Sequence, residues 1–177
     1  MKILSSLALL MLILSPTQAG QLEKKLADIQ LNKSNMSVLD RYGNPNDIEI
    51  VNIDKNVINL ISDYGKIYST PTQFESVKWI YKFTTHKIEV SYNSNSFVES
   101  ITISGNTSPH QTLKNIKLGS KYSDVVFKYG NPNYTVEYED SIVLNFKSNN
   151  LSFKISKSKT VPMKYWIVKE ISINNQE

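Results

Sequence analysis

The sequence predicts an α+β fold made of two tandem modules, each a short helix packed on an antiparallel β meander of three to four strands. Two observations support this prediction. The pentapeptide YGNPN occurs at residues 42–46 and again at residues 129–133, and the apolar positions of residues 26–46 align without a gap on those of residues 113–133. After each pentapeptide, apolar and polar residues alternate with a period of two, which is typical of strands with one buried face.

Residues 1–19 are predicted to be a cleaved signal peptide that lies outside the fold. Lys2 gives a positive start, residues 3–14 are mostly apolar, Pro16 ends the run, and Ala19 offers a small residue for cleavage. The apolar run is shorter than the about 20 residues that a membrane-spanning helix needs. We therefore expect a bacterial protein that is periplasmic or secreted, with an uncleaved N-terminal anchor as the alternative.

Composition narrows the possible partners. The chain has no cysteine, and therefore neither disulfides nor the lipidation cysteine of a lipoprotein. Its formal net charge of +4 is mild and its lysines are interspersed with acids, so we expect no nucleic-acid partner. No segment after the signal peptide is long and apolar enough to span a membrane, so we expect no stable membrane insertion after cleavage.

Each module is predicted to begin with one short helix. In the first copy, Ser34 is the expected N-cap of a helix over residues 35–42. In the second copy, Ser120 or Lys121 opens a helix that runs to about residue 129. The apolar residues of each segment recur at helical spacing and form a single stripe for packing.

The repeated pentapeptide is interpreted as a structural helix stop. Gly43 and Gly130 each follow the last helical residue, where a left-handed conformation favours glycine. Pro45 and Pro132 come two residues later and prevent the helix from resuming. The pentapeptide therefore recurs because the same helix recurs.

Strands are predicted after each helix stop. The first module has them at residues 77–83, 86–92 and 97–104, and the second at residues 141–146, 151–156 and 164–173. Residues 47–76 form an insertion in the first module, in which residues 48–53 fit a strand and residues 56–65 fit either a strand or a helical turn. We place the first module at residues 20–105 and the second at residues 106–177.

The alternation assigns one face of the sheet to the core and the other to solvent. The predicted core face carries Trp79, Tyr81, Phe83, Ile88, Val90, Tyr92, Ile101, Ile103, Ile142, Leu144, Phe146, Phe153, Ile155, Ile171 and Ile173. The predicted polar face carries Lys82, Lys87, Glu89, Ser91, Thr102, Asn145, Lys154, Glu170 and Ser172.

The pattern I-x-L-G-x-x-x-x-x-V-x-x-x-Y-G-N-P at residues 116–132, followed by a meander, resembles a family of small exported bacterial modules. It is similar to the repeats of the β-lactamase-inhibitor-protein-like (BLIP-like) fold and of the SmpA/OmlA (BamE-like) outer-membrane assembly lipoproteins. The resemblance implies helices on one face of an antiparallel sheet, with the other face free to dock on protein. The first copy departs from the pattern, with Asn32 where Gly119 stands, and the lipidation cysteine is missing.

The chemistry-bearing residues do not predict an enzyme. His86 and His110 lack neighbouring acids at metal-ligand spacing, and a zinc site needs three or four ligands, so we expect no metal and no cofactor. The acidic run at residues 137–140 is interpreted as a solvated turn. A periplasmic hydrolase built on paired carboxylates is the lesser alternative.

Aromatic and apolar residues on the polar face are the candidate partner-binding residues, because interface hot spots favour Trp and Tyr. If the last strand is regular, Trp166 and Val168 project away from the core, whereas a bulge near residues 163–166, or packing of the second module, returns Trp166 to the core. The candidates are Trp166, Val168, Val143, Lys154, Tyr134 and Tyr138.

We therefore expect an exported, non-enzymatic protein-binding module that acts through its exposed sheet face, as an inhibitor or as an envelope-assembly accessory. The partner is expected to be another protein of the envelope or extracellular space. The alternative is a binder of a small ligand or an envelope glycan, with Tyr165 and Trp166 in an aromatic groove.

Overall fold

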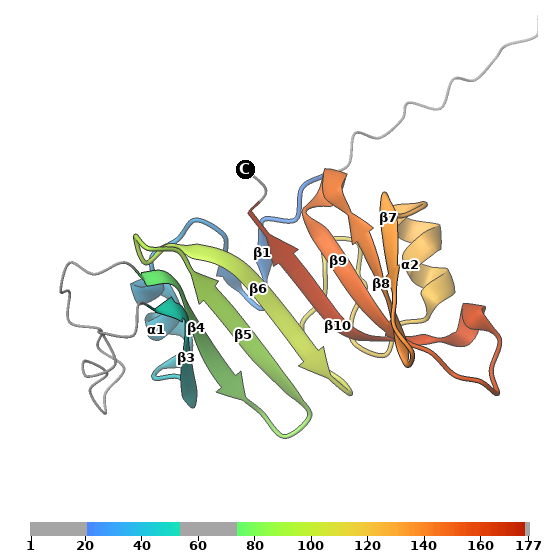
Figure 1. The fold of residues 1–177 in the computed structure, drawn as a ribbon, viewed down its shortest axis with the longest axis horizontal. Coiled ribbons are helices and arrows are strands. Elements are labelled where there is room, and N and C mark those ends of the chain that lie inside the picture. The colour runs from blue at the N-terminus through green and yellow to red at the C-terminus, as the bar shows by residue number, and fades with distance from the viewer. Residues whose placement is uncertain (1–20, 54–73, 176–177) are drawn as a thin grey trace, which may run out of the picture.

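A computed structural model describes residues 21–53 and 74–175 (Figure 1). The predicted signal peptide at residues 1–19, and the ambiguous segment at residues 56–65, lie outside the described residues. The elements, in chain order, are β1 (Lys25–Leu26), β2 (Ile29–Gln30), α1 (Asn35–Tyr42), β3 (Asp47–Ile53), β4 (Phe74–Lys82), β5 (His86–Tyr92), β6 (Val98–Gly105), α2 (Tyr122–Tyr129), β7 (Tyr134–Glu137), β8 (Ser141–Phe146), the 3₁₀ turn η2 (Lys147–Asn149), β9 (Leu151–Ser156), the 3₁₀ turn η3 (Met163–Tyr165) and β10 (Ile167–Asn174).

The predicted α+β class is confirmed. Strands β1 and β2 form a small hairpin, and the others form one eight-stranded sheet in the order β3-β4-β5-β6-β10-β9-β8-β7. Each neighbouring pair is antiparallel. We call α1 with β3–β6 the first half and α2 with β7–β10 the second half.

The two halves share this sheet through their last strands. β6 and β10 lie side by side at its centre, with Ile103 opposite Ile171 and Ile101 opposite Ile173 (Figure 1). All four side chains are fully buried. The pairing brings together segments that are far apart in the chain, and it places both edge strands, β3 and β7, at the outer ends of the sheet.

One face of the sheet is covered and the other is open. The predicted core-face residues are buried, except Phe83, which follows the end of β4 and is 45% exposed. They pack with residues from the hairpin and both helices, including Leu26, Ile29, Val38 and Val125. The burial of apolar side chains from both layers therefore explains why the helices lie on this face alone.

The helices agree with the predicted bounds. α1 follows Ser34, whose side chain makes no capping hydrogen bond. α2 follows Lys121, and the Asp124 carboxylate accepts a hydrogen bond from the Lys121 backbone N–H (3.2 Å), which satisfies one free donor of the first turn. Gly43 and Gly130 come directly after the helices.

Each of these glycines has a positive φ, 72° at Gly43 and 79° at Gly130, with ψ at −157° in both. The prediction of a left-handed helical conformation is therefore wrong for the ψ angle. The positive φ angle still favours glycine. Their N–H groups donate to the carbonyl oxygens of Leu39 and Val126, which closes the helix ends.

The last asparagine of each pentapeptide fastens the turn to the sheet. The side-chain oxygen of Asn46 accepts a hydrogen bond from the backbone N–H of Lys82 (2.7 Å), and that of Asn133 accepts one from Lys147 (2.7 Å). The backbone N–H of Asn46 donates to Ile80, and that of Asn133 donates to Asn145. The pentapeptide thus ends a helix and positions the edge strand that follows.

β5, β8 and β9 have their predicted bounds, β3, β4, β6 and β10 differ at one or both ends, and one strand was missed. β3 begins one residue before the candidate strand at residues 48–53, whereas β10 begins at Ile167, after the turn η3. β7 was the missed strand, and its last residue belongs to the acidic run at residues 137–140 that was interpreted as a solvated turn. Its residues are all exposed, so it buries too little apolar surface to show the usual strand pattern.

Candidate functional site

The open face of the second half carries four of the predicted partner-binding residues. By register, Glu170 of β10 lies opposite Ser104 of β6 and Lys154 of β9. Lys154 lies opposite Val143 of β8, which in turn lies opposite Val136 of the edge strand β7. A single cross-strand row therefore runs from a hydroxyl through a carboxylate and an ammonium group to two valines.

A β-bulge in β10 corrects the prediction for Val168. Val168 pairs with Ile155, but the next paired residue is Glu170, opposite Lys154, so Lys169 is an extra residue in β10. The bulge reverses the alternation, and Val168 points into the core with 0% exposure. The expectation that Val168 faces solvent, which assumed a regular strand, is therefore wrong.

The Trp166 side chain also packs against the protein. It is half-buried and packs against the core. Its indole N–H donates to the carbonyl oxygens of Val161 (2.9 Å) and Ser158 (3.2 Å), so the loop before β10 wraps around the ring. Trp166 therefore holds a loop in place. It returns only partly to the core, which the alternative expected of a bulge, and the bulge lies at Val168–Glu170 and not near residues 163–166.

Exposed apolar side chains gather at the β7 edge of the open face. Tyr134, Val136 and Tyr138 are 48%, 38% and 54% exposed. Tyr134 and Val136 lie on one side of β7, Tyr138 continues this spacing directly after the strand, and Val143 lies beside Val136. We call these four residues the tyrosine patch.

Two lysines border the tyrosine patch. The Lys147 ammonium lies 5.4 Å from the centre of the Tyr134 ring, and the Lys154 ammonium lies 5.9 Å from that of Tyr138. Both distances suit a cation–π interaction. Lys157 is instead occupied, since its Nζ donates to the Glu137 carboxylate (3.1 Å) and to the Tyr138 carbonyl (2.7 Å).

A polar hollow of about 280 Å³ adjoins this row of residues. It is lined by Ser104, Asp140, Ser141, Lys154, Ser156, Lys169 and Glu170. Burial raises the pKa of the Glu170 carboxyl above its usual value, and the nearby Lys154 opposes this effect only in part. Asp140 and Ser141 lie where the β7–β8 turn enters β8, and Lys169 is the extra residue of the β10 bulge. The sequence pattern did not reveal these three residues.

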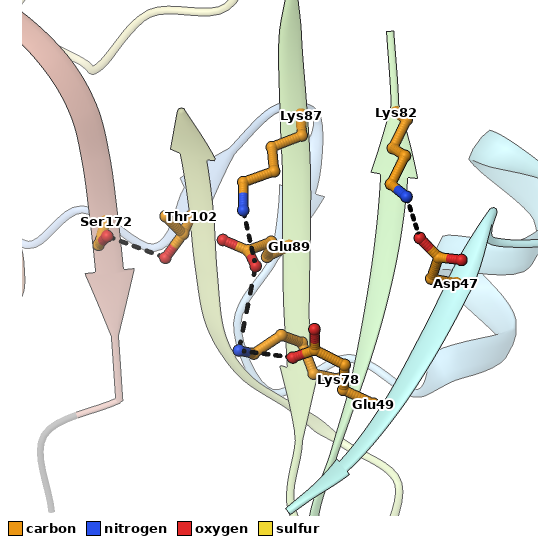
Figure 2. Close-up of polar contacts among 8 residues, drawn as sticks. All are labelled: Asp47, Glu49, Lys78, Lys82, Lys87, Glu89, Thr102 and Ser172. Atoms are coloured by element: carbon orange, nitrogen blue, oxygen red, sulfur yellow. Dashed lines mark hydrogen bonds and ion pairs between the residues drawn. The ribbon is translucent and has the colours of Figure 1, made fainter. Parts of the chain in front are cut away.

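The first half of the open face is built differently (Figure 2). Lys78 pairs with Glu49 (3.3 Å) and Glu89 (4.0 Å), and Glu89 also pairs with Lys87 (3.3 Å). Lys82 pairs with Asp47. This half therefore satisfies its charges internally.

A cavity of about 430 Å³ lies on the covered side, between the β1–β2 hairpin and the connection from β6 to α2. His110 lines it and packs edge-on against His86, with ring centres 5.8 Å apart. Burial lowers the pKa of both imidazoles, which favours their neutral forms. Over residues 21–53 and 74–175, no group of three or more His, Asp or Glu side chains is arranged to hold a metal ion.

Val136 and most of the polar hollow were not predicted from the sequence. The spacing of Tyr134, Val136 and Tyr138 at every second residue was an available strand signal. The hollow had no such signal, because it depends on strands from both halves. In the described part of the chain, no helix is long and apolar enough to cross a membrane.

Comparison with known proteins finds distant structural neighbours. No protein-family model and no curated protein matches the chain. A cysteine-rich secretory protein from Staphylococcus aureus aligns over 88% of this chain and 48% of its own length, with 9% identity and a TM-score of 0.49. A DUF4309 family protein from Bacillus subtilis aligns over 85% of this chain and 84% of its own, with 10% identity and a TM-score of 0.48. The chain thus spans about half the length of the staphylococcal protein.

Proposed function

We propose that the protein is an exported, non-enzymatic module that binds another protein of the envelope or extracellular space through the open face of its sheet. The observation that carries this proposal is the tyrosine patch, in which Tyr134 and Val136 of the edge strand β7 are exposed together with Tyr138 just after it. Large, exposed aromatic side chains beside apolar surface are the usual anchors of protein interfaces.

The charges around the patch favour a partner that presents apolar side chains flanked by carboxylates. Lys147 and Lys154 place their ammonium groups over the tyrosine rings and have no ion pair within 4 Å among the described residues. Carboxylates of the partner would meet these ammonium groups one each, at the two ends of the patch, where complementary charge increases the rate of association. An inhibitor and an envelope-assembly accessory both fit this description.

We also infer that the chain consists of two tandem modules, at residues 20–105 and 106–177, of the kind found in the BLIP-like and BamE-like families. The equal helices, the equal backbone angles at Gly43 and Gly130, and the equal bonds of Asn46 and Asn133 support this inference. Export rests on the predicted signal peptide at residues 1–19.

The test is affinity capture with matched variants. Residues 20–177 would be immobilised, exposed to envelope extract and culture fluid of the source bacterium, and the retained proteins identified by mass spectrometry. The proposal expects one stoichiometric protein that is lost with the double variant Tyr134→Ala/Tyr138→Ala and is released by salt.

The control is Phe127→Ala. Phe127 lies on α2, on the covered side, and at 89% exposure it is more exposed than either tyrosine of the patch. It should leave capture unchanged. An empty column, or a retained protein that survives the double variant, would contradict binding through the open face.

A further inference from the structure

The polar hollow shows a pair of opposite charges that do not meet. Glu170 and Lys154 are directly opposite across β10 and β9, where side chains start about 5 Å apart. Within the described residues, their charged groups form neither a hydrogen bond nor an ion pair within 4 Å. The Lys154 ammonium lies over the Tyr138 ring instead.

Glu170 is therefore a half-buried carboxylate that no hydrogen-bond donor of the described chain satisfies. Such a group keeps most of the cost of its lost hydration, which a donor from a ligand would repay. A carboxylate on the open face of the first half behaves differently, because Glu89 is reached by both Lys87 and Lys78. The missing contact is thus a property of this hollow and not of the open face in general.

Three other lining residues make hydrogen bonds within the protein. Ser141 donates its hydroxyl to the Asp140 carboxylate (2.9 Å), and Lys169 donates to the side-chain oxygen of Asn106 (2.9 Å). The backbone N–H of Lys157 donates to the Asp140 carbonyl (2.8 Å), which fixes the β7–β8 turn at the rim. A preorganised site loses less entropy when it binds a ligand.

The balance of charge in the hollow favours a neutral ligand. Two carboxylates and two ammonium groups line it, so it attracts neither sign strongly over the other. Its free groups are an acceptor at Glu170, a donor at Lys154, and the hydroxyl of Ser104, which is both. A ligand with neighbouring hydroxyl groups satisfies all three, since each hydroxyl both donates and accepts.

We propose that this hollow binds a saccharide, with neighbouring hydroxyl groups bridging the Glu170 carboxylate and the Lys154 ammonium. The exposed Tyr138 ring stands at the rim, where the apolar face of a sugar ring packs against it. This function goes beyond the proposed protein binding and uses a neighbouring part of the open face that overlaps the protein-binding surface at Lys154 and Tyr138.

The proposal is tested by recording backbone amide NMR spectra of the protein during titration with glucose, galactose, N-acetylglucosamine and the linear trimer of N-acetylglucosamine. Shifts should concentrate at the amides of Ser104, Lys154 and Glu170. A higher affinity for the trimer than for its monomer identifies a glycan chain as the ligand, and equal affinities identify a free sugar. Both outcomes support a saccharide site.

Matched variants decide whether the shifts come from this hollow. Glu170→Gln keeps the size but removes the charge, and Lys154→Met removes the ammonium, so each should weaken saccharide binding about tenfold. Glu49→Gln is the control, because Glu49 lies on the same face in the first half and pairs with Lys78. It should leave the affinity unchanged.

Three results would overturn the proposal: no saccharide shifting these amides up to its solubility limit, shifts that persist in both variants, and stronger shifts with methylguanidinium or acetate than with any sugar. None of these results depends on the protein partner, because no partner is present in the titration. If Glu170→Gln does not fold, Lys154→Met decides the outcome alone.

Discussion

The two halves of the sheet present different surfaces on the same open face. In the first half, the acids Asp47, Glu49 and Glu89 are each paired with a lysine, as Figure 2 shows. In the second half, Glu170 and Lys154 stay apart. A surface whose charges are satisfied internally gains little from a partner, because binding must first break those pairs.

The exposure of apolar side chains on the open face also differs between the halves, and it is greater in the second half. Ile80 shares the open face with its cross-strand neighbour Glu89, yet it is 6% exposed. Val136 and the two tyrosines of the second half are far more exposed. One architecture thus carries an ion-paired surface in one half and a surface with exposed aromatic side chains in the other.

The largest expected effect comes from breaking the seam that joins the halves. Ile171→Ala removes a fully buried side chain where β10 meets β6, and we expect it to lower the free energy of unfolding by about 2–5 kcal/mol. Urea denaturation monitored by tryptophan fluorescence measures this loss. Because the core is continuous, both halves should still unfold in one transition.

The matched control is Ser172→Ala on the same strand. Its hydroxyl faces the open side and hydrogen-bonds Thr102 (2.8 Å), so the loss should be about 1 kcal/mol. Two separate transitions in the Ile171→Ala protein would show instead that the halves are independent domains.

Trp166→Ala should have the next largest effect. The ring is half-buried and both carbonyl oxygens that it binds would lose their donor, so we expect a loss of about 2 kcal/mol, below the roughly 3–5 kcal/mol of a fully buried tryptophan. Its exposed neighbour Tyr165, changed to alanine, is the control and should have little effect on stability. A Trp166→Ala protein that keeps full stability but loses its partner would restore the anchor interpretation.

The asparagine contacts sharpen the comparison between the halves. Asn46→Ala and Asn133→Ala each remove one acceptor from a backbone N–H, and each should cost about 1 kcal/mol in thermal or urea unfolding. Equal losses would support the equivalence of the two turns. A loss of stability at one position alone would show that the repeated pentapeptide has a different structural role in each half.

The smallest expected effect is a pH dependence. His86 and His110 have pKa values lowered by burial, so the unfolded chain binds protons more readily than the folded one. Stability should therefore fall as pH drops from about 7.5 to 6, through the usual histidine pKa of about 6.5. The His86→Phe variant should reduce this dependence of stability on pH. An unchanged dependence would contradict the role given to His86.

Other titratable groups change the stability in a different pH range or in the opposite direction. The Asp28 carboxyl has a lowered pKa, caused first by its contact with Lys25, so its contribution is lost only below the usual Asp range. Burial raises the pKa of Glu23 and Glu170, so protonation of these groups favours the folded state as pH falls. A loss of stability as pH falls towards 6 therefore has the sign of the histidines, because the two glutamates act in the opposite sense.

The sequence predicted those features that depend on neighbours along the chain. The bounds of both helices and the buried faces of β5, β8 and β9 follow from spacing, capping and alternation. β7 was missed because every residue in it is exposed, which removes the contrast between its faces.

The sequence by itself thus determined the α+β class, the two helix stops and the inward side of most strands, because these reflect local backbone preferences and a period of two. Only the tertiary structure decided that β6 pairs with β10, that a bulge turns Val168 inward, and that Glu170 and Lys154 share a hollow without touching. Strand pairing and register depend on contacts between distant segments, and one extra residue in a strand reverses every side chain beyond it.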